Sequence, residues 1–375
     1  MWHPGILVLL AVLGTALFVC TGLILTQHWH GKLSLDHDLS GVQKIHSRPV
    51  PRIGGTAIFL ALLIGGLGAV LIDDPNAEKI LILLGCCLPA FLAGVLEDLT
   101  KKVGVRTRLY ASFMSAALAI WFLDASLTRL DTPGLNFLIA FTPISLLFTT
   151  FAVGGLTNAV NIIDGINGLA AGSVMLMLAG LGALAWFHHD ILVFELCMLG
   201  FAALAGFIVL NFPGGHIFLG DGGAYLAGFW LAECAVLLLT RQPNLSTWAV
   251  LLICIYPVCE TVFSMFRRHV IGRTSSGLAD QTHLHHLLLN RLRTSTSCER
   301  ASWKNHALAS VVLWALVLAC QVLAMMAYPS NSMMVSGVLW FGLVYLALYW
   351  LTTHFYSDRT CSAAEQRPLI KLRND

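Results

Sequence analysis

The chain has 375 residues, of which 57% are hydrophobic and only 11% are charged. Its mean hydropathy is +0.77. Soluble domains carry about 25% charged residues, so this composition excludes a soluble globular protein and indicates an integral membrane protein. The net charge of +2 is too small to indicate nucleic acid as a partner.

Long apolar segments are distributed along the whole chain. A helix that crosses a bilayer needs roughly 20 apolar residues, and on this rule we predict about eleven transmembrane helices. The expected ranges are 5–27, 53–72, 79–96, 109–125, 136–157, 168–187, 191–210, 223–239, 247–265, 306–328 and 333–355. The first segment is too long for a signal-peptide core and lacks a preceding basic residue, so we expect it to be retained. With no internal repeat or linker, we predict an all-α polytopic integral membrane protein with one domain over residues 1–375.

Basic residues predict the orientation of these segments. Of the 22 lysines and arginines, all except Lys79, Arg129 and Arg241 fall on the odd-numbered connections or the C-terminal tail. Because cytoplasmic loops carry an excess of Lys and Arg, we expect this side to be cytoplasmic. The N-terminus is then outside and the C-terminus inside.

The ten cysteines do not indicate disulfides or a metal site. Eight of them lie in apolar segments and no CxxC pair occurs. We interpret these eight as small core residues.

A polar stretch from Asn158 to Ala170 interrupts two apolar segments. It contains Asp164 together with Asn158, Asn161 and Asn167. Burying an unpaired carboxylate or amide in hydrocarbon is costly, so we expect this stretch to face water, a cation or a polar ligand.

Glu97 and Asp98 lie at the end of a predicted span and precede Lys101 and Lys102. Carboxylates at a helix C-terminus oppose the helix dipole. They are either a solvated pair offset by the two lysines, or a general base or ligand beside an anionic substrate.

Asp221 is flanked by glycines in the segment Phe218–Gly223, which follows Asn211. Glycine allows the backbone to approach a ligand closely, and a single carboxylate suits Mg²⁺, which keeps waters and shares substrate phosphates. The alternative is an N-cap for the next span, and Asp164 has the same ambiguity.

The loop between the ninth and tenth spans contains three histidines and several arginines. Its candidate ligands are His283, His285, His286, Arg267 and Arg268. Zinc is disfavoured because no suitably spaced cysteine or carboxylate follows, and a diphosphate suits these donors better; a solvated loop is the remaining alternative. Glu233 and Glu260 fall inside spans, and Glu260, after Pro257, is either functional or marks a kinked helix.

Apart from Glu233 and Glu260, these groups fall on the predicted cytoplasmic loops, at about 28–52, 97–108, 158–167, 211–222 and 266–305. A transporter is the competing class, but transporters gather polar residues near the bilayer midplane, usually in repeated halves. Polar groups at one surface instead indicate a site where a soluble phosphorylated molecule meets a lipid.

The motifs resemble those of the polyprenyl-phosphate N-acetylhexosamine-1-phosphate transferases, which include the phospho-N-acetylmuramoyl-pentapeptide transferases. The stretch NxxNxxDGxxGLA at 158–170 and FxGD at 218–221 carry the resemblance. It implies Mg²⁺-dependent transfer (Mn²⁺ as a substitute) of a sugar 1-phosphate from a UDP-sugar to undecaprenyl phosphate in the cytoplasmic membrane, releasing UMP. A homodimer is compatible with the sequence.

The resemblance also implies residue roles. Asp98, beside Glu97, matches the group that deprotonates the lipid phosphate, and Asp221 matches the magnesium ligand. Asp164 matches an essential aspartate, either nucleophile or part of the nucleotide pocket. The positions that match the uridine pocket are Asn161, Asn211 and Phe218, while Asn158, Asn167, Arg52, Lys101, Lys102, Arg267, Arg268 and the three histidines are expected to bind substrate. The acidic pair is Glu97-Asp98 where many members have two aspartates. The spacing HxHH departs from the three consecutive histidines of the muramoyl-pentapeptide branch. Together with the segment His46–Gly55 and the pair Arg267 and Arg268, it favours the branch that begins O-antigen (lipopolysaccharide), teichoic-acid or exopolysaccharide chains.

Overall fold

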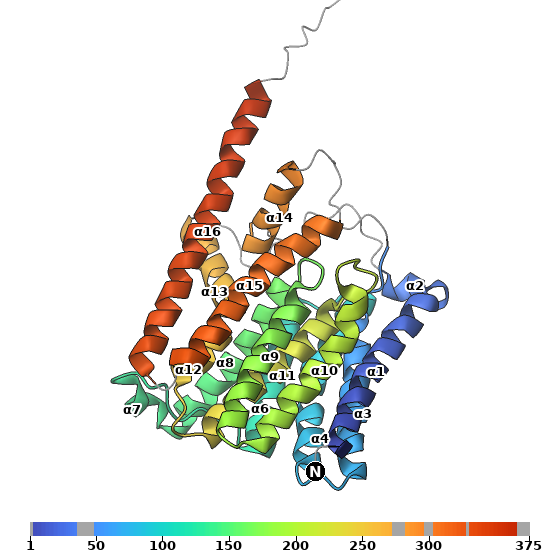
Figure 1. Ribbon diagram of the computed structural model, residues 1–375, viewed down its shortest axis with the longest axis vertical. Coiled ribbons are helices and arrows are strands. Elements are labelled where there is room, and N and C mark those ends of the chain that lie inside the picture. The colour runs from blue at the N-terminus through green and yellow to red at the C-terminus, as the bar shows by residue number, and fades with distance from the viewer. Residues whose placement is uncertain (1–2, 36–48, 272–281, 296–302, 328–329, 366–375) are drawn as a thin grey trace, which may run out of the picture.

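A computed structural model describes residues 3–35, 49–271, 282–295, 303–327 and 330–365, and within these ranges it contains helices and no strand (Figure 1). The helices are α1 (His3–Leu25), α2 (Gln27–Ser34), α3 (Gly54–Leu71), α4 (Ala77–Cys86), α5 (Leu88–Thr100), α6 (Val105–Leu123), α7 (Leu135–Ile139), α8 (Thr142–Ile163), α9 (Leu169–Phe187), α10 (Ile191–Asn211), α11 (Gly220–Arg241), α12 (Thr247–Ile253), α13 (Ile255–Phe266), the π-helix η1 (Arg267–Ile271), α14 (Leu284–Ser295), α15 (Trp303–Ala327) and α16 (Asn331–Glu365). Residues 36–48, 272–281 and 296–302 of the predicted cytoplasmic loops, including His46, lie outside the described residues.

Each of the eleven predicted spans is occupied by a helix or a helix pair. Eight helices are long and apolar enough to cross a membrane, and two bent pairs raise the number to ten among the described residues. The remaining predicted span corresponds to α6, which begins with two arginines in its first four residues. The protein is therefore a helical multi-pass membrane protein; the count of eleven and the orientation stay predictions.

Three predicted spans are not continuous helices. The range 79–96 breaks into α4 and α5 with a 45° bend, where Pro89 stands in the first turn of α5 and cannot donate a helical hydrogen bond. The range 136–157 is divided into α7 and α8, with Pro143 at the start of α8. The range 247–265 bends by 79° between α12 and α13, and Gln321 Nε2 donates to the Ile253 carbonyl at this break, at 3.0 Å.

Helix α11 is the centre of the bundle and is buried along its whole apolar length. It packs against α3, α5, α6, α8, α9 and α10. Glycines bring two of these helices very close: a Cβ atom at Gly94 would lie 2.6 Å from Cα of Gly222, and one at Gly228 would lie 2.9 Å from Cα of Thr157. Larger residues at these positions would separate α11 from α5 and α8.

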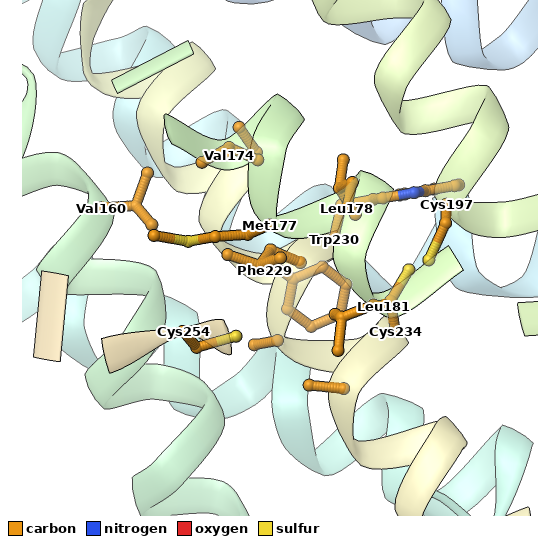
Figure 2. Packing of buried hydrophobic residues seen from close by; sticks show 14 of the residues in the cluster. Val160, Val174, Met177, Leu178, Leu181, Cys197, Phe229, Trp230, Cys234 and Cys254 are labelled. Atoms are coloured by element: carbon orange, nitrogen blue, oxygen red, sulfur yellow. The ribbon is translucent and has the colours of Figure 1, made fainter. Parts of the chain in front are cut away.

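The apolar core follows α11 into the neighbouring helices (Figure 2). Trp230 is buried among Leu178, Met177 and Leu181 of α9 and donates its Nε1–H to the Leu196 carbonyl, at 2.9 Å. The eight cysteines in apolar segments are all free, and all but half-buried Cys259 are buried. The interpretation of these cysteines as core residues is confirmed.

The two ends of the bundle differ. Helices α2 and α14 lie at one end, and the N-terminus and α7 lie at the other (Figure 1). At the α7 end, ion pairs join Arg129 to Asp131 at 2.6 Å and Arg241 to buried Asp190 at 2.7 Å. These pairs fasten the connecting segments, since Arg129 also donates to the carbonyls of Gln242 and Leu245.

Candidate active site

A glycine turn at the start of α11 organises the site. Gly220 has a φ of +73°, a conformation that favours glycine, and a Cβ atom there would lie 2.6 Å from Oδ2 of Asp98. The buried Asp98 carboxylate accepts hydrogen bonds from the backbone N–H groups of Asp221 and Gly222, each at 2.9 Å. The end of α5 therefore holds the start of α11, and both aspartates lie at this junction.

Arg52 reaches the same junction from the segment before α3. Its guanidinium lies 3.6 Å from the Asp98 carboxylate and 3.5 Å from the Asp221 carboxylate. Arg108, from the first turn of α6, forms a second ion pair with Asp221 and lies over the ring of Tyr225, 5.9 Å from the ring centroid. Two cationic side chains thus face Asp221.

Backbone hydrogen bonds fix the segment that carries Arg52. The N–H of Phe218 donates to the Pro51 carbonyl at 2.8 Å, and the N–H of Gly54 donates back to the Phe218 carbonyl at 3.0 Å. Gly55 continues this pattern with the Leu219 carbonyl at 3.0 Å. The conformation of this segment and that of the glycine turn therefore depend on each other.

Asp164 adds a third carboxyl group at the C-cap of α8. It interacts electrostatically with Asp98 and Arg52. Burial raises the pKa of the Asp164 carboxyl group to about 7, against the opposing effect of Arg52. Asp164 nevertheless keeps part of its solvent exposure.

The four candidate asparagines have different surroundings. Asn211 accepts from the N–H of Gly168 and donates to the Ile217 carbonyl, both at 2.7 Å, so its amide ties two loops together. Asn167 donates to the Pro213 carbonyl at 3.0 Å, and Asn158 accepts from the Tyr225 hydroxyl at 2.9 Å. The half-buried side chain of Asn161 has no hydrogen bond within the part of the chain that the structure describes.

The histidine motif packs directly on the asparagine-rich stretch. His285 is fully buried, and a Cβ atom at Gly165 would lie 2.7 Å from its Cδ2. The rings of His283 and His285 are parallel, with centroids 5.5 Å apart, and His286 lies 4.3 Å from His285. Burial lowers the pKa of His285 well below its usual value, with smaller contributions from His286 and His283, so the ring beside Asp164 and Gly165 is neutral.

The remaining candidates lie at the edge of this region. Glu97 accepts the N–H of Val103 at 2.7 Å through Oε2 and so shapes the turn after α5. Lys101, in the left-handed conformation, and Lys102 are exposed on that turn. The pair Arg267 and Arg268 begins η1 and is half-buried.

Two residues of the junction were not predicted. Arg108 was counted only as a basic loop residue, and Tyr225 lies inside a span. The only sequence signal for Arg108 is a cation in the first turn of a helix, where the dipole disfavours it; it therefore needs an anionic partner such as Asp221.

The junction carries an excess of negative charge. Asp98, Asp164 and Asp221 face Arg52 and Arg108, and Glu97 adds electrostatically to Asp98. Among the described residues no group of three His, Cys, Asp or Glu side chains is arranged to hold a metal ion alone. Mg²⁺ commonly takes only one or two protein carboxylates and completes its shell with water and phosphate, so the donors present fit this ion.

The fold and the junction thus define a helical membrane protein with an acidic polar site where several helices end. The family model described as "Glycosyl transferase family 4" matches residues 80–239, which include Asp98, Asp164 and Asp221. A probable undecaprenyl-phosphate N-acetylglucosaminyl 1-phosphate transferase of Bacillus subtilis is 27% identical over 66% of this chain and 68% of its own length. An undecaprenyl-phosphate alpha-N-acetylglucosaminyl 1-phosphate transferase of Thermotoga maritima is 29% identical over 67% and 72%. A phospho-N-acetylmuramoyl-pentapeptide-transferase of Desulfitobacterium hafniense is 27% identical over 75% and 84%. These matches confirm the resemblance to the polyprenyl-phosphate sugar-1-phosphate transferases.

Proposed function

We propose that this protein transfers a sugar 1-phosphate, of the N-acetylhexosamine class, from a UDP-sugar to undecaprenyl phosphate and releases UMP. The convergence of Asp98, Asp164 and Asp221 on Arg52 carries the proposal. Its substrates would bring two anionic phosphate groups together, which requires both cationic donors and a proton acceptor. The names of the relatives support the same reaction class.

In this reaction an oxygen of the lipid phosphate attacks the phosphorus attached to the sugar. The bond from that phosphorus to the bridging oxygen breaks, and UMP leaves with the electron pair. Mg²⁺, held by Asp221 together with substrate phosphates, would offset charge on the diphosphate. Arg52 and Arg108 are placed beside Asp221 to stabilise the charge that develops on the leaving group.

We assign the proton transfer to Asp164 and a holding role to Asp98. The sequence resemblance gives the base role to Asp98, but both oxygens of this buried carboxylate already accept backbone N–H groups. Asp164 is more exposed than Asp98, and among the described residues no N–H group donates to its carboxylate, so its oxygens are open to a proton from the substrate. If Asp98 also acts as a base, the loss of rate in Asp98→Asn will depend on pH; if it only holds the turn, the loss will not.

A cell-surface polysaccharide pathway is the natural context, with the site open to the cytoplasm where nucleotide sugars are found. The second candidate is transfer of phospho-N-acetylmuramoyl-pentapeptide. The relative from Desulfitobacterium with that name matches 75% of this chain, more than the 66% and 67% matched by the other two relatives. The HxHH spacing of His283, His285 and His286 favours the first candidate.

Release of UMP tests the proposal. Purified protein is mixed with undecaprenyl phosphate, Mg²⁺ and either UDP-N-acetylglucosamine or UDP-N-acetylmuramoyl-pentapeptide, and UMP and lipid-linked sugar are measured. We expect UMP only when donor, lipid and metal are all present. The matched control is Glu78→Gln, an exposed carboxylate at the start of α4, which should keep full activity. Absence of UMP with both donors, from folded protein, would refute the proposal.

A further inference from the structure

Glu260 is a carboxyl group inside α13 that the proposed reaction does not use. Its side chain is buried, with 1% exposure. Its Oε1 atom accepts a hydrogen bond from Nδ1 of His283 at 2.9 Å and another from the backbone N–H of Leu284 at 3.2 Å. A buried carboxylate is strongly unfavourable without such partners, so these contacts explain how Glu260 is accommodated.

The two hydrogen bonds determine where α14 begins. Leu284 is the first residue of α14, and its N–H is one of the groups that a helix leaves without an internal partner. A carboxylate at this position also interacts favourably with the helix dipole. Glu260 therefore acts as a cap supplied by another helix, and it fixes the ring of His283 at the same time.

From this cap, α14 leads directly to the aspartate junction. His285 follows His283 with a parallel ring at 5.5 Å and packs against Gly165, next to Asp164. Neither ring nitrogen of buried His285 has a hydrogen-bond partner within the described ranges. Displacement of the start of α14 would therefore displace a ring that borders the catalytic candidates.

We infer that Glu260 is a positioning residue that holds the histidine motif against the Asp164–Gly165 turn for binding of the donor diphosphate. The inference rests on the proposed function for the identity of the donor. Among the described residues, the titratable groups near this carboxylate include Tyr256 and Cys259 of α13 and Tyr345 of α16, types that are ordinarily neutral at pH 7. The rings of His285 and His286 lie near His283, with centroids at 5.5 and 6.3 Å.

The test is Glu260→Gln, which keeps the shape and an acceptor for Leu284 but removes the charge. Removing the carboxylate partner of a functional histidine typically costs about 10- to 100-fold in metal sites, and we expect a similar loss in kcat/KM for the UDP-sugar. The KM for undecaprenyl phosphate should stay unchanged.

Glu233→Gln is the matched control. Glu233 is a fully buried carboxyl group of α11 whose oxygens have no hydrogen-bond partner within the described part of the chain. It lies twelve residues beyond Asp221, roughly 18 Å along the helix. This variant should leave kcat/KM for the UDP-sugar unchanged.

A second measurement does not depend on turnover. The ring resonances of His283 and His285 are followed by NMR on histidine-labelled protein, with His283→Gln and His285→Gln for assignment, and both should move in Glu260→Gln. If Glu260→Gln does not fold, Glu260→Asp, which withdraws the carboxylate by one methylene group, should move the same resonances and lower kcat/KM for the UDP-sugar. Unchanged resonances together with an unchanged kcat/KM would overturn the inference. If wild-type protein releases no UMP, the proposed function fails, and the histidine resonances still decide the role of Glu260.

Discussion

Replacing Asp98 by Asn separates a holding role from a catalytic one. In the wild-type protein one carboxylate accepts two backbone hydrogen bonds, from Asp221 and Gly222, each at 2.9 Å. Asn offers one acceptor oxygen, and its NH₂ group would face the other N–H, donor to donor. The exchange is therefore not neutral, although the two side chains have nearly the same shape.

The magnitude follows from these two bonds. A hydrogen bond to a charged group contributes about 1.5–3 kcal/mol, a neutral one about 1 kcal/mol, and an unsatisfied buried N–H costs about 1–3 kcal/mol. Removal of a buried charge offsets part of this loss, so we expect Asp98→Asn to destabilise the turn by about 2–4 kcal/mol. Asp221 stands in this turn, so its carboxylate would move with the turn. A displacement of that carboxylate by about 1 Å would lower the transfer rate about 10²-fold.

The assays are thermal unfolding of the purified protein and UMP release between pH 6 and pH 9. Glu97→Gln is the control, because its carbonyl oxygen can still accept the Val103 N–H; it should change stability by less than about 1 kcal/mol. A lipid phosphate with a second pKa near 6 is mostly dianionic above neutral pH, so a base role for Asp98 predicts a rate deficit that shrinks as pH rises. The holding role predicts a constant deficit. If Asp98→Asn unfolds at the same temperature as the wild-type protein, the holding role of Asp98 is refuted.

Three further predictions concern the metal, the proton and the orientation. Asp221→Asn should abolish UMP release while the protein still folds, and EDTA should silence the wild type until Mg²⁺ or Mn²⁺ is added; activity after thorough chelation would contradict the metal role. The rate should rise with pH through about 7 in the wild type, because the Asp164 carboxyl group ionises there, and Asp164→Asn should lose this limb and about 10²–10⁴-fold in rate. The same raised pKa means that the ionised Asp164 destabilises the fold above about pH 7 but not below the unfolded pKa near 4, so Asp164→Asn should gain more in unfolding temperature over the wild type at pH 8 than at pH 4. Reporter fusions should behave as cytoplasmic after Gly31, Lys102 and Thr294 and as external after Asn76 and Asn244. A fusion found on the opposite side would contradict the prediction that the candidate site residues share the cytoplasmic side.

Sequence patterns predicted the helices well because each apolar segment specifies its own helix. They predicted poorly where the helices break: Pro89 accompanies the bend at Cys87, whereas the bend at Cys254 involves a distant partner. The carbonyl of Ile253 at the second bend is satisfied by Gln321 of α15, a contact across 68 residues that no local pattern reveals.

The candidate site shows the same division. Asp98 and Asp221 were recognised by their glycine and acidic neighbours, but their direct connection joins residues 123 positions apart. Arg108 was overlooked for this reason. For Glu260 the sequence left two alternatives open, a functional residue or the mark of a kinked helix, because its partner His283 lies beyond a long loop. Asn211 was predicted by resemblance as a uridine contact; in the structure its amide already joins Gly168 to Ile217, and the uridine contact stays a prediction.

The enclosure of α11 has a consequence for how the protein is made. This helix carries Asp221 at one end and, in its interior, Glu233, which has no hydrogen-bond partner in the described part of the chain. Both side chains are unfavourable in lipid. Six helices that pack against α11, from α3 to α10, precede it in the chain, and α12 follows it. During synthesis a socket of neighbouring helices is therefore already present when α11 leaves the ribosome. We expect that moving α11 earlier in a permuted chain would cause degradation during biogenesis, even though the finished structure would contain the same contacts.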